Sequence, residues 1–173
     1  MKKTLLEVLD DAKQIIPSLG GVPCLAFPII DNTVEESFPI FFENDIEKLK
    51  TFFAIGAYSY EKEFDGLILV LDGCNKEIPD KDKDYFFENL DIERPTLYPR
   101  KFRNNFIIIQ FIDFIKSEHL TLLCEYEKKE NKYEFTQSKF TDKIESVLVE
   151  LTVDGWNTQY DIDEDEAEED YDV

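Results

Sequence analysis

The chain has 173 residues, and its 39 acidic side chains outnumber its 19 basic ones to give a formal net charge of −20. This charge argues against free nucleic acid or an anionic membrane as a partner, because an acidic surface repels both. Hydrophobic residues make up 43% of the chain and aromatic residues 14%, which is more apolar material than a disordered chain contains. The length suits one domain that buries about two-thirds of the surface exposed by its unfolded chain.

The cysteines and the N-terminal segment indicate the compartment. Cys24, Cys74 and Cys124 are odd in number and contain no CxxC pair, so we expect neither a disulfide framework nor a zinc site. Acidic side chains interrupt the apolar part of the N-terminal segment, which makes it a poor signal peptide. No apolar run approaches the ~20 residues needed to cross a bilayer. We therefore predict a soluble, cytoplasmic protein with reduced cysteines.

The first elements predicted along the chain are a helix and two short strands. Apolar residues recur at helical spacing over residues 5–16, and Pro17 with Gly20 and Gly21 is expected to stop that helix. Residues 22–30 and 38–42 are apolar runs of strand length. Because both runs contain proline, we expect them at sheet edges or to end where the proline lies.

A second helix is predicted after Asn44, which is a suitable N-cap with Glu47 placed to complete a capping box. Its apolar stripe comprises Ile46, Leu49, Phe52, Phe53 and Tyr60. The pair Asp65-Gly66 is expected to end this helix and to open a continuous apolar run over residues 66–73. Such a run is typical of a strand that is buried on both faces, near the middle of a sheet.

The second half of the chain begins with a long charged loop over residues 74–104. Three strands are predicted after it, over residues 105–115, 119–127 and 132–137, joined by short polar turns. A third helix is predicted from Phe140 to its end at Gly155. Apolar residues in its second half also alternate as in a strand, but we prefer the helix.

This order of elements predicts an α+β fold, because strands and helices do not alternate regularly as in a doubly wound fold. We expect a single two-layer domain over residues 1–160, with a mixed or antiparallel sheet of about five to six strands packed by two to three helices. Residues 161–173 are expected to form a separate acidic C-terminal tail, which we predict to be flexible.

The tail contains nine acidic side chains and no basic one, and its removal leaves a net charge of −11 on residues 1–160. The expected partner-binding residues are Asp161, Asp163, Glu164, Asp165, Glu166, Glu168, Glu169, Asp170 and Asp172. A tail of this kind either keeps a protein soluble or occupies a basic groove on another protein. We do not predict a metal site there, because Glu166 stands where a calcium loop requires glycine.

All three arginines lie within ten residues of one another, with a lysine beside them, in a chain that otherwise uses lysine for its positive charge. Guanidinium groups recognise carboxylate or phosphate in a planar, bidentate manner. Arg94, Arg100, Lys101 and Arg103 are therefore the expected anion-binding residues. They could bind a phosphorylated metabolite, a partner carboxylate or the tail, or they could simply pair with the acidic residues 80–93.

No catalytic motif is present, and no cofactor is predicted. The single histidine, His119, lies in a predicted turn, where an exposed histidine is common. Asp72 is the best candidate for an acidic catalytic group, because it ends the expected central strand, where Cys74, Arg100 and Arg103 could converge.

The acidic character favours one function over the others. We predict a non-enzymatic, acidic protein-interaction factor, such as an inhibitor, an immunity-type protein or a nucleic-acid mimic. Its partner would be a basic protein, such as one that binds nucleic acid. A small-anion-binding or regulatory module that uses the segment from Arg94 to Arg103 is the first alternative, and an enzyme built around Asp72 is the second.

Overall fold

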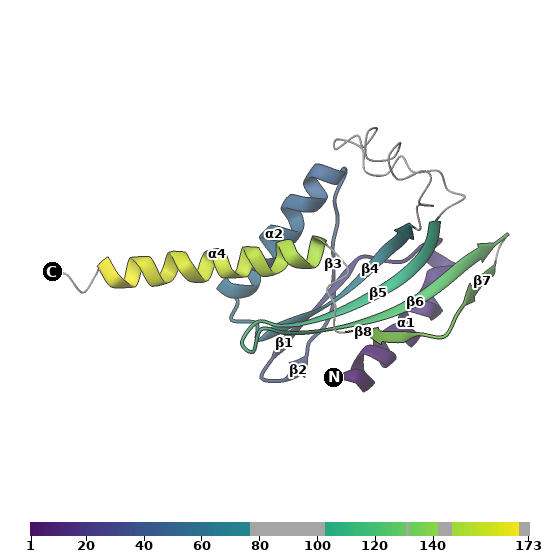
Figure 1. The fold of residues 1–173 in the computed structure, drawn as a ribbon, viewed down its shortest axis with the longest axis horizontal. Coiled ribbons are helices and arrows are strands. Elements are labelled where there is room, and N and C mark those ends of the chain that lie inside the picture. The colour runs from purple at the N-terminus through teal and green to yellow at the C-terminus, as the bar shows by residue number, and fades with distance from the viewer. Residues whose placement is uncertain (77–102, 131, 142–146, 170–173) are drawn as a thin grey trace.

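The computed structural model describes residues 1–76, 103–130, 132–141 and 147–169 of the chain, which form an antiparallel sheet with three helices around it (Figure 1). The elements, in chain order, are α1 (Lys2–Leu19), β1 (Leu25–Ile30), β2 (Thr33–Val34), β3 (Phe38–Pro39), α2 (Asp45–Glu61), β4 (Gly66–Lys76), β5 (Arg103–Asp113), β6 (Glu118–Lys129), β7 (Lys132–Phe135), β8 (Lys139–Thr141) and α4 (Val147–Glu169).

The sheet has eight strands, with a main path in the order β2-β1-β4-β5-β6-β7. The two remaining short strands pair at its sides, β3 with β1 and β8 with β6, and every pairing is antiparallel. β4 lies inside the sheet between β1 and β5, as its continuous apolar sequence predicted. Leu67 and Ile68 are fully buried on its opposite faces. The predicted α+β class and antiparallel sheet are therefore confirmed.

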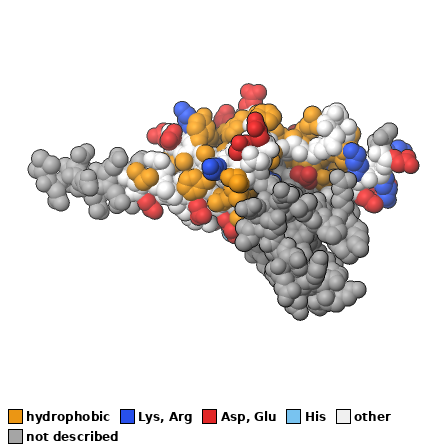
Figure 2. All heavy atoms as spheres, turned by 90° about the horizontal axis from the view of Figure 1, so that it is seen from above, with side chains coloured by type: hydrophobic (Ala, Val, Ile, Leu, Met, Phe, Trp, Pro, Cys, Tyr) orange, Lys and Arg blue, Asp and Glu red, His pale blue; other side chains and the backbone are white. Residues whose placement is uncertain are grey.

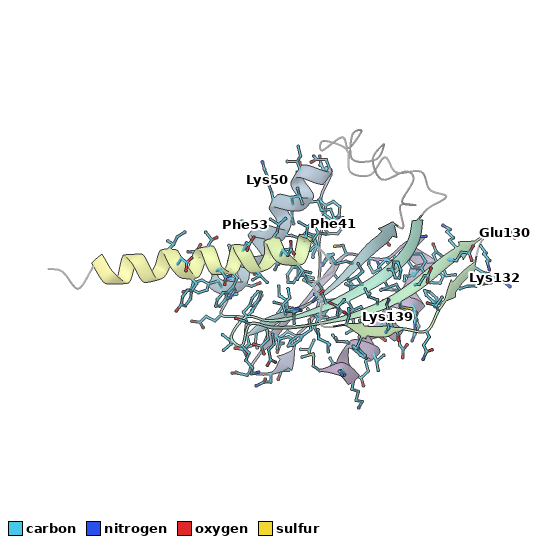
Figure 3. The ribbon with its side chains drawn as sticks, viewed as in Figure 1. Phe41, Lys50, Phe53, Glu130, Lys132 and Lys139 are labelled. Carbon is cyan, nitrogen blue, oxygen red and sulfur yellow. The ribbon has the colours of Figure 1, made fainter. Side chains whose placement is uncertain are left out.

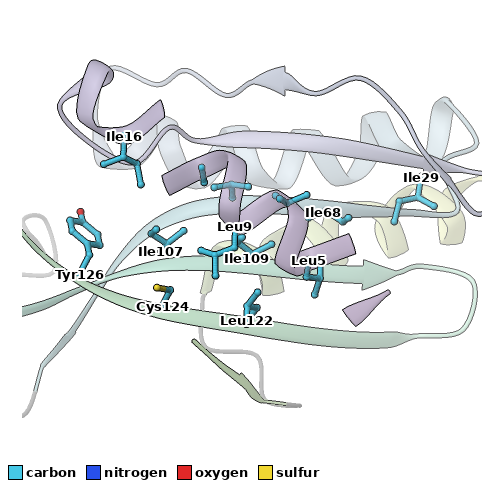
Figure 4. Packing of buried hydrophobic residues seen from close by; sticks show 13 residues of the cluster. Leu5, Leu9, Ile16, Ile29, Ile68, Ile107, Ile109, Leu122, Cys124 and Tyr126 are labelled. Carbon is cyan, nitrogen blue, oxygen red and sulfur yellow. The ribbon is translucent and has the colours of Figure 1, made fainter. Parts of the chain in front are cut away.

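Helices cover both faces of the sheet. On one face, Leu5 and Leu9 of α1 pack with Ile68, Ile109 and Leu122 (Figure 4). On the other face, buried side chains of α2 and α4 pack against β4 and β5. The predicted two-layer domain had one layer of helices on one face of the sheet, whereas the structure has a layer of helices on each face. Both faces must be covered because β4 and β5 are apolar on both.

The end of α1 and the start of α2 show how local chemistry sets a boundary. α1 continues through Pro17, which was expected to contribute to its end, and it ends as predicted at Gly20, which adopts a left-handed conformation with φ of 77° and donates its N–H to the carbonyl of Ile16. Asn44 caps α2 as predicted, its Oδ1 accepting from the Glu47 N–H at 2.9 Å. The carboxylate of Glu47 accepts from the N–H of Glu43 and not of Asn44, so the box closes one residue earlier than expected.

The last helix differs from its prediction at both ends. Phe140 lies in β8, so the predicted helical start at this residue is wrong, and α4 begins at Val147. The predicted end at Gly155 is also wrong, because α4 continues to Glu169. The helix was preferred to a strand for this segment, and from Val147 onward that preference is confirmed.

Candidate interaction surface

The acidic C-terminal segment begins as a direct continuation of α4. The helix carries the chain from Val147 to Glu169 and extends beyond the edge of the sheet (Figure 1). Asp161 is exposed on it. Residues 163–169 are described by their helical backbone alone, while Asp170 and Asp172 lie outside the described residues. The partner-binding role and the flexibility of this segment stay predictions.

Most of the arginine cluster falls outside the described part of the chain. This holds for Arg94, Arg100 and Lys101. Arg103 opens β5, and its backbone stands opposite Lys76 at the end of β4. Lys76 is four residues beyond Asp72 on β4, so Arg103 and Asp72 lie towards the same end of the β4–β5 ladder. The anion-binding role of the cluster stays a prediction.

Asp72 forms a long-range hydrogen bond across the sheet. It stands opposite Ile107 of β5, and its Oδ1 accepts from the hydroxyl of Tyr126 on β6 at 3.0 Å. Part of the residue remains exposed, but the atoms packed around its carboxyl group remove water and raise its pKa. The hydrogen bond from Tyr126 and the positive charge of Lys48 act in the opposite direction. The site thus holds a partly desolvated carboxyl group whose orientation is fixed by a phenol.

The described neighbours of Asp72 do not add an activated nucleophile. Burial raises the pKa of Cys24 to about 11, with a further contribution from Asp72 and an opposing one from Lys48. This thiol is therefore protonated at neutral pH, whereas a nucleophilic cysteine requires the thiolate. His119 stands opposite Ile112, five residues along β5 from the partner of Asp72, which is roughly 17 Å in a strand.

The histidine and the carboxyl group thus belong to different ends of the sheet. In the described ranges, His, Cys, Asp and Glu side chains do not form a group of three or more that could hold a metal ion. Cys74, the other predicted neighbour, stands opposite Asn105 in the β4–β5 ladder.

A close crossing fixes α4 against α2. A Cβ atom on Gly56 would meet the backbone carbonyl oxygen of Thr152, and one on Gly155 would meet that of Phe53. Two glycines, one on each helix, therefore allow the backbones to touch. Immediately after the crossing, Trp156 stacks on Phe114 with ring centroids 5.4 Å apart. These contacts determine the direction in which α4 carries its acidic end.

Charge is distributed unequally between the two helical layers. We use the name α2–α4 layer for residues 43–65 and 147–169, which contain fifteen acidic side chains and three lysines. α1, on the opposite face of the sheet, contains three acidic side chains and three lysines. The α2–α4 layer thus carries a net charge of −12 while α1 is neutral, and seven of its fifteen acidic residues belong to the end of α4 that extends beyond the edge of the sheet.

The same layer exposes large apolar side chains. Ile46, Leu49, Phe53 and Tyr58 on α2 have 65%, 43%, 38% and 45% of their surfaces exposed. Figure 2 looks onto the upper side of the molecule and shows hydrophobic side chains there with acidic ones beside them. Ile46, Leu49 and Phe53 belong to the same predicted apolar stripe as Phe52, but of these four only Phe52 is buried.

This surface was missed because periodicity shows that a helix is apolar without showing which side the sheet covers. The signal that could have revealed it is the number of apolar positions on α2, which exceeds what one buried stripe can hold.

Within the described residues, no helix combines the length and the apolar character that crossing a membrane requires. No family model matches the chain, and neither the curated proteins nor the solved structures provide a significant match to it.

Proposed function

We propose that this chain is an acidic protein-interaction factor that binds a basic protein through the α2–α4 layer. The observation that carries the proposal is the unequal charge of the two helical layers, −12 against zero. α1 has three lysines to balance its three acidic side chains, whereas the α2–α4 layer has three lysines against fifteen. A charge that is unequal between the two layers gives the approaching partner a preferred orientation.

The location of the acidic residues on α4 also favours a cationic partner. Seven of the nine residues from Asp161 to Glu169 are acidic, so like charges recur at spacings of three and four residues along the helix. They also stand at the C-terminal end of α4, where the helix dipole is already negative. A basic partner relieves both sources of repulsion, and it therefore binds and stabilises the same segment.

The class of partner follows from this surface. A run of acidic residues along a helix resembles the phosphates of a nucleic acid in its charge, and the basic grooves that hold nucleic acid are complementary to both. We therefore place the chain among inhibitors, immunity-type proteins or nucleic-acid mimics, with a nucleic-acid-binding protein as the target.

The test has two steps. Proteins that the chain captures from a lysate at low salt are identified, and the association rate with a captured basic protein is then measured against ionic strength. We expect the rate to fall steeply as salt rises, because the Debye length is about 8 Å at physiological ionic strength. A nucleic-acid duplex should compete for the same partner. A salt-insensitive rate without competition would contradict the proposed function.

A further inference from the structure

α2 has an apolar face that the rest of the described chain does not cover. Seven positions at spacings of three and four residues form this surface, and six of them are apolar. We call it the outer α2 face, and it comprises Ile46, Leu49, Lys50, Phe53, Ala54, Ala57 and Tyr58. This is the pattern by which a helix normally packs against a core. In α2, however, all seven side chains are exposed except Ala57, which is half-buried.

The exposed residues form one continuous surface. From Ile46 to Tyr58 the helix rises about 18 Å, which is enough to accommodate more than three turns of a second helix. The opposite side of α2 is already occupied, because Phe52, Ile55 and Ser59 are buried against the sheet and α4. α2 therefore has the composition of a helix that is packed on two sides. In the described structure, however, only one of its sides is packed against other elements.

The charges at the ends of the outer α2 face indicate what would cover it. Glu43 and Glu47 are exposed beside its first turn, and Glu61 and Glu63 are exposed at its last. Two neighbouring lysines are held on aromatic rings: the Lys48 ammonium lies 5.1 Å from the Phe42 ring centroid, and that of Lys62 lies 5.6 Å from the Tyr58 ring centroid. Each end of this face thus has two glutamates against one lysine and is net negative, while the centre is apolar apart from Lys50.

A second copy of the chain is a poor occupant. Its own outer α2 face would bring another layer with a charge of −12 into contact with the first. Like charges at such short range oppose association, and salt screens them little when water is excluded. An apolar segment with positive charges at its margins satisfies both the apolar centre and the acidic ends.

We propose that the outer α2 face is the docking site for a cationic amphipathic helix of the partner protein. The apolar side of that helix covers Ile46, Leu49 and Phe53, and its lysines or arginines contact the glutamates at the two ends of α2. This inference rests on the proposed function, since it names the part of the basic partner that binds and the place where it binds.

The probe is a synthetic peptide of about 14 residues, made of leucine and lysine at helical spacing, with a fluorescent label. A peptide of the same composition in scrambled order serves as the control for charge alone. Binding is followed by fluorescence anisotropy, and the site is located by backbone NMR shifts of the intact chain. We expect the amphipathic peptide to bind more tightly than the scrambled one and to shift the resonances of α2.

A matched pair of variants tests the apolar centre. Ile46 and Ile115 are exposed to almost the same extent, 65% and 67%, but Ile115 lies in the turn between β5 and β6. We expect Ile46→Ser to weaken peptide binding about tenfold and Ile115→Ser to leave it unchanged. Leu49→Ser provides a second variant of the same face, and unchanged thermal midpoints verify that all three remain folded.

A second pair tests the sign of the partner's charge. Lys50 lies on α2 and Lys139 on β8, in separate parts of the molecule, and both are exposed (Figure 3). Lys50→Glu and Lys139→Glu change the net charge of the chain equally. We expect Lys50→Glu to tighten peptide binding about threefold and Lys139→Glu to have a smaller effect. Weaker binding by Lys50→Glu would overturn the assignment of a cationic occupant.

Two further results would overturn the site. One is an equal effect of the two isoleucine variants, or equal binding of the two peptides. The other is a dimer of the wild-type chain in analytical ultracentrifugation that Ile46→Ser abolishes, since the occupant would then be a second copy. If salt-sensitive binding to a basic protein persists while Ile46→Ser has no effect, the proposed function stands and this docking site is wrong.

Discussion

At the scale of single residues, the bond between Asp72 and Tyr126 has a consequence for stability. Desolvation raises the pKa of Asp72 above its ordinary value of 3.8, despite the opposing effects of Tyr126 and Lys48. The folded chain therefore binds a proton at this carboxyl group more readily than the unfolded chain does. Ionised Asp72 lowers the free energy of unfolding at neutral pH, and that loss disappears as the pH falls below the ordinary pKa.

We predict that Asp72→Asn stabilises the protein at neutral pH. The amide keeps an oxygen that can accept from the Tyr126 hydroxyl, but it carries no charge that requires solvation. Because part of the residue still contacts water, the gain in the free energy of unfolding should be small, about 0.5 kcal/mol at neutral pH. No gain is expected at a pH below 3.8. Urea denaturation at the two pH values measures both quantities.

Asp154→Asn is the control for this variant, because it removes the same charge from an exposed position on α4. Removing one negative charge from an acidic chain relieves general charge repulsion equally in both variants. Only the additional gain in the free energy of unfolding of Asp72→Asn is therefore due to the desolvated carboxyl group. A loss of stability in Asp72→Asn at neutral pH would show instead that the charge of Asp72 is favourable, and that its contacts outweigh the cost of desolvation.

At the scale of elements, the crossing of α2 and α4 determines how the acidic segment is presented. Gly56 and Gly155 let the two backbones touch, and Trp156 then anchors α4 to Phe114. Tyr60 meets the same indole edge-on, with centroids 5.3 Å apart. The orientation of α4 thus depends on the two glycines at the crossing and on the aromatic cluster around Trp156. Gly155 and Trp156 both lie close to the middle of α4.

We predict that Gly155→Ala destabilises the protein, although alanine is the better helix former by about 1 kcal/mol. The added methyl group would overlap the backbone carbonyl of Phe53, and a backbone cannot move aside as a flexible side chain can. We expect a net loss of about 1–2 kcal/mol in urea denaturation. Asn157→Ala is the control, since it improves helix propensity at an exposed position of the same helix and should not destabilise it.

The elements that could be predicted from sequence are those governed by local signals. The Asn44 cap fixed the start of α2, and the uninterrupted apolar run identified β4 as an interior strand. The missed boundaries depend on tertiary contacts. α4 continues through Gly155 because α2 packs there, and a glycine within an isolated segment gives no indication of that neighbour.

The candidate site shows the same division between local and long-range information. The sequence revealed the charge but not its unequal distribution between the two helical layers, because that depends on which helices share a face of the sheet. The hydrogen bond between Asp72 and Tyr126 joins residues 54 positions apart, so no short motif encodes it. The number of apolar positions on α2 indicates more than one buried stripe, but the helical pattern does not show which of these positions a neighbour covers.

At the scale of the whole molecule, the unequal charge of the two helical layers gives the protein an asymmetric electrostatic field. In the proposed function, the field of the α2–α4 layer would act on the partner before contact, and the apolar outer α2 face would act only after water has been expelled. The two effects are therefore separable in kinetics. The distributed acidic charge should control the association rate, while the apolar contact should control the dissociation rate.

This separation predicts the effect of removing residues 161–173. The deletion takes away nine of the 39 acidic side chains but keeps Tyr160, which stacks on Trp156, so we expect the thermal midpoint to be unchanged or slightly higher. The association rate with the leucine–lysine peptide should fall about tenfold at low salt, while its dissociation rate changes little. Stopped-flow fluorescence measures both rates.

The control for the deletion is a full-length variant in which the nine acidic side chains of this segment are replaced by their amides. If charge is the cause, this variant loses the same part of the association rate as the deletion does, because both retain the outer α2 face and the same −11 on residues 1–160. A large drop in thermal midpoint on deletion would instead assign the segment a structural role. If the association rate falls in the deletion variant but not in the variant with amides, the length of α4, and not its charge, determines the association rate.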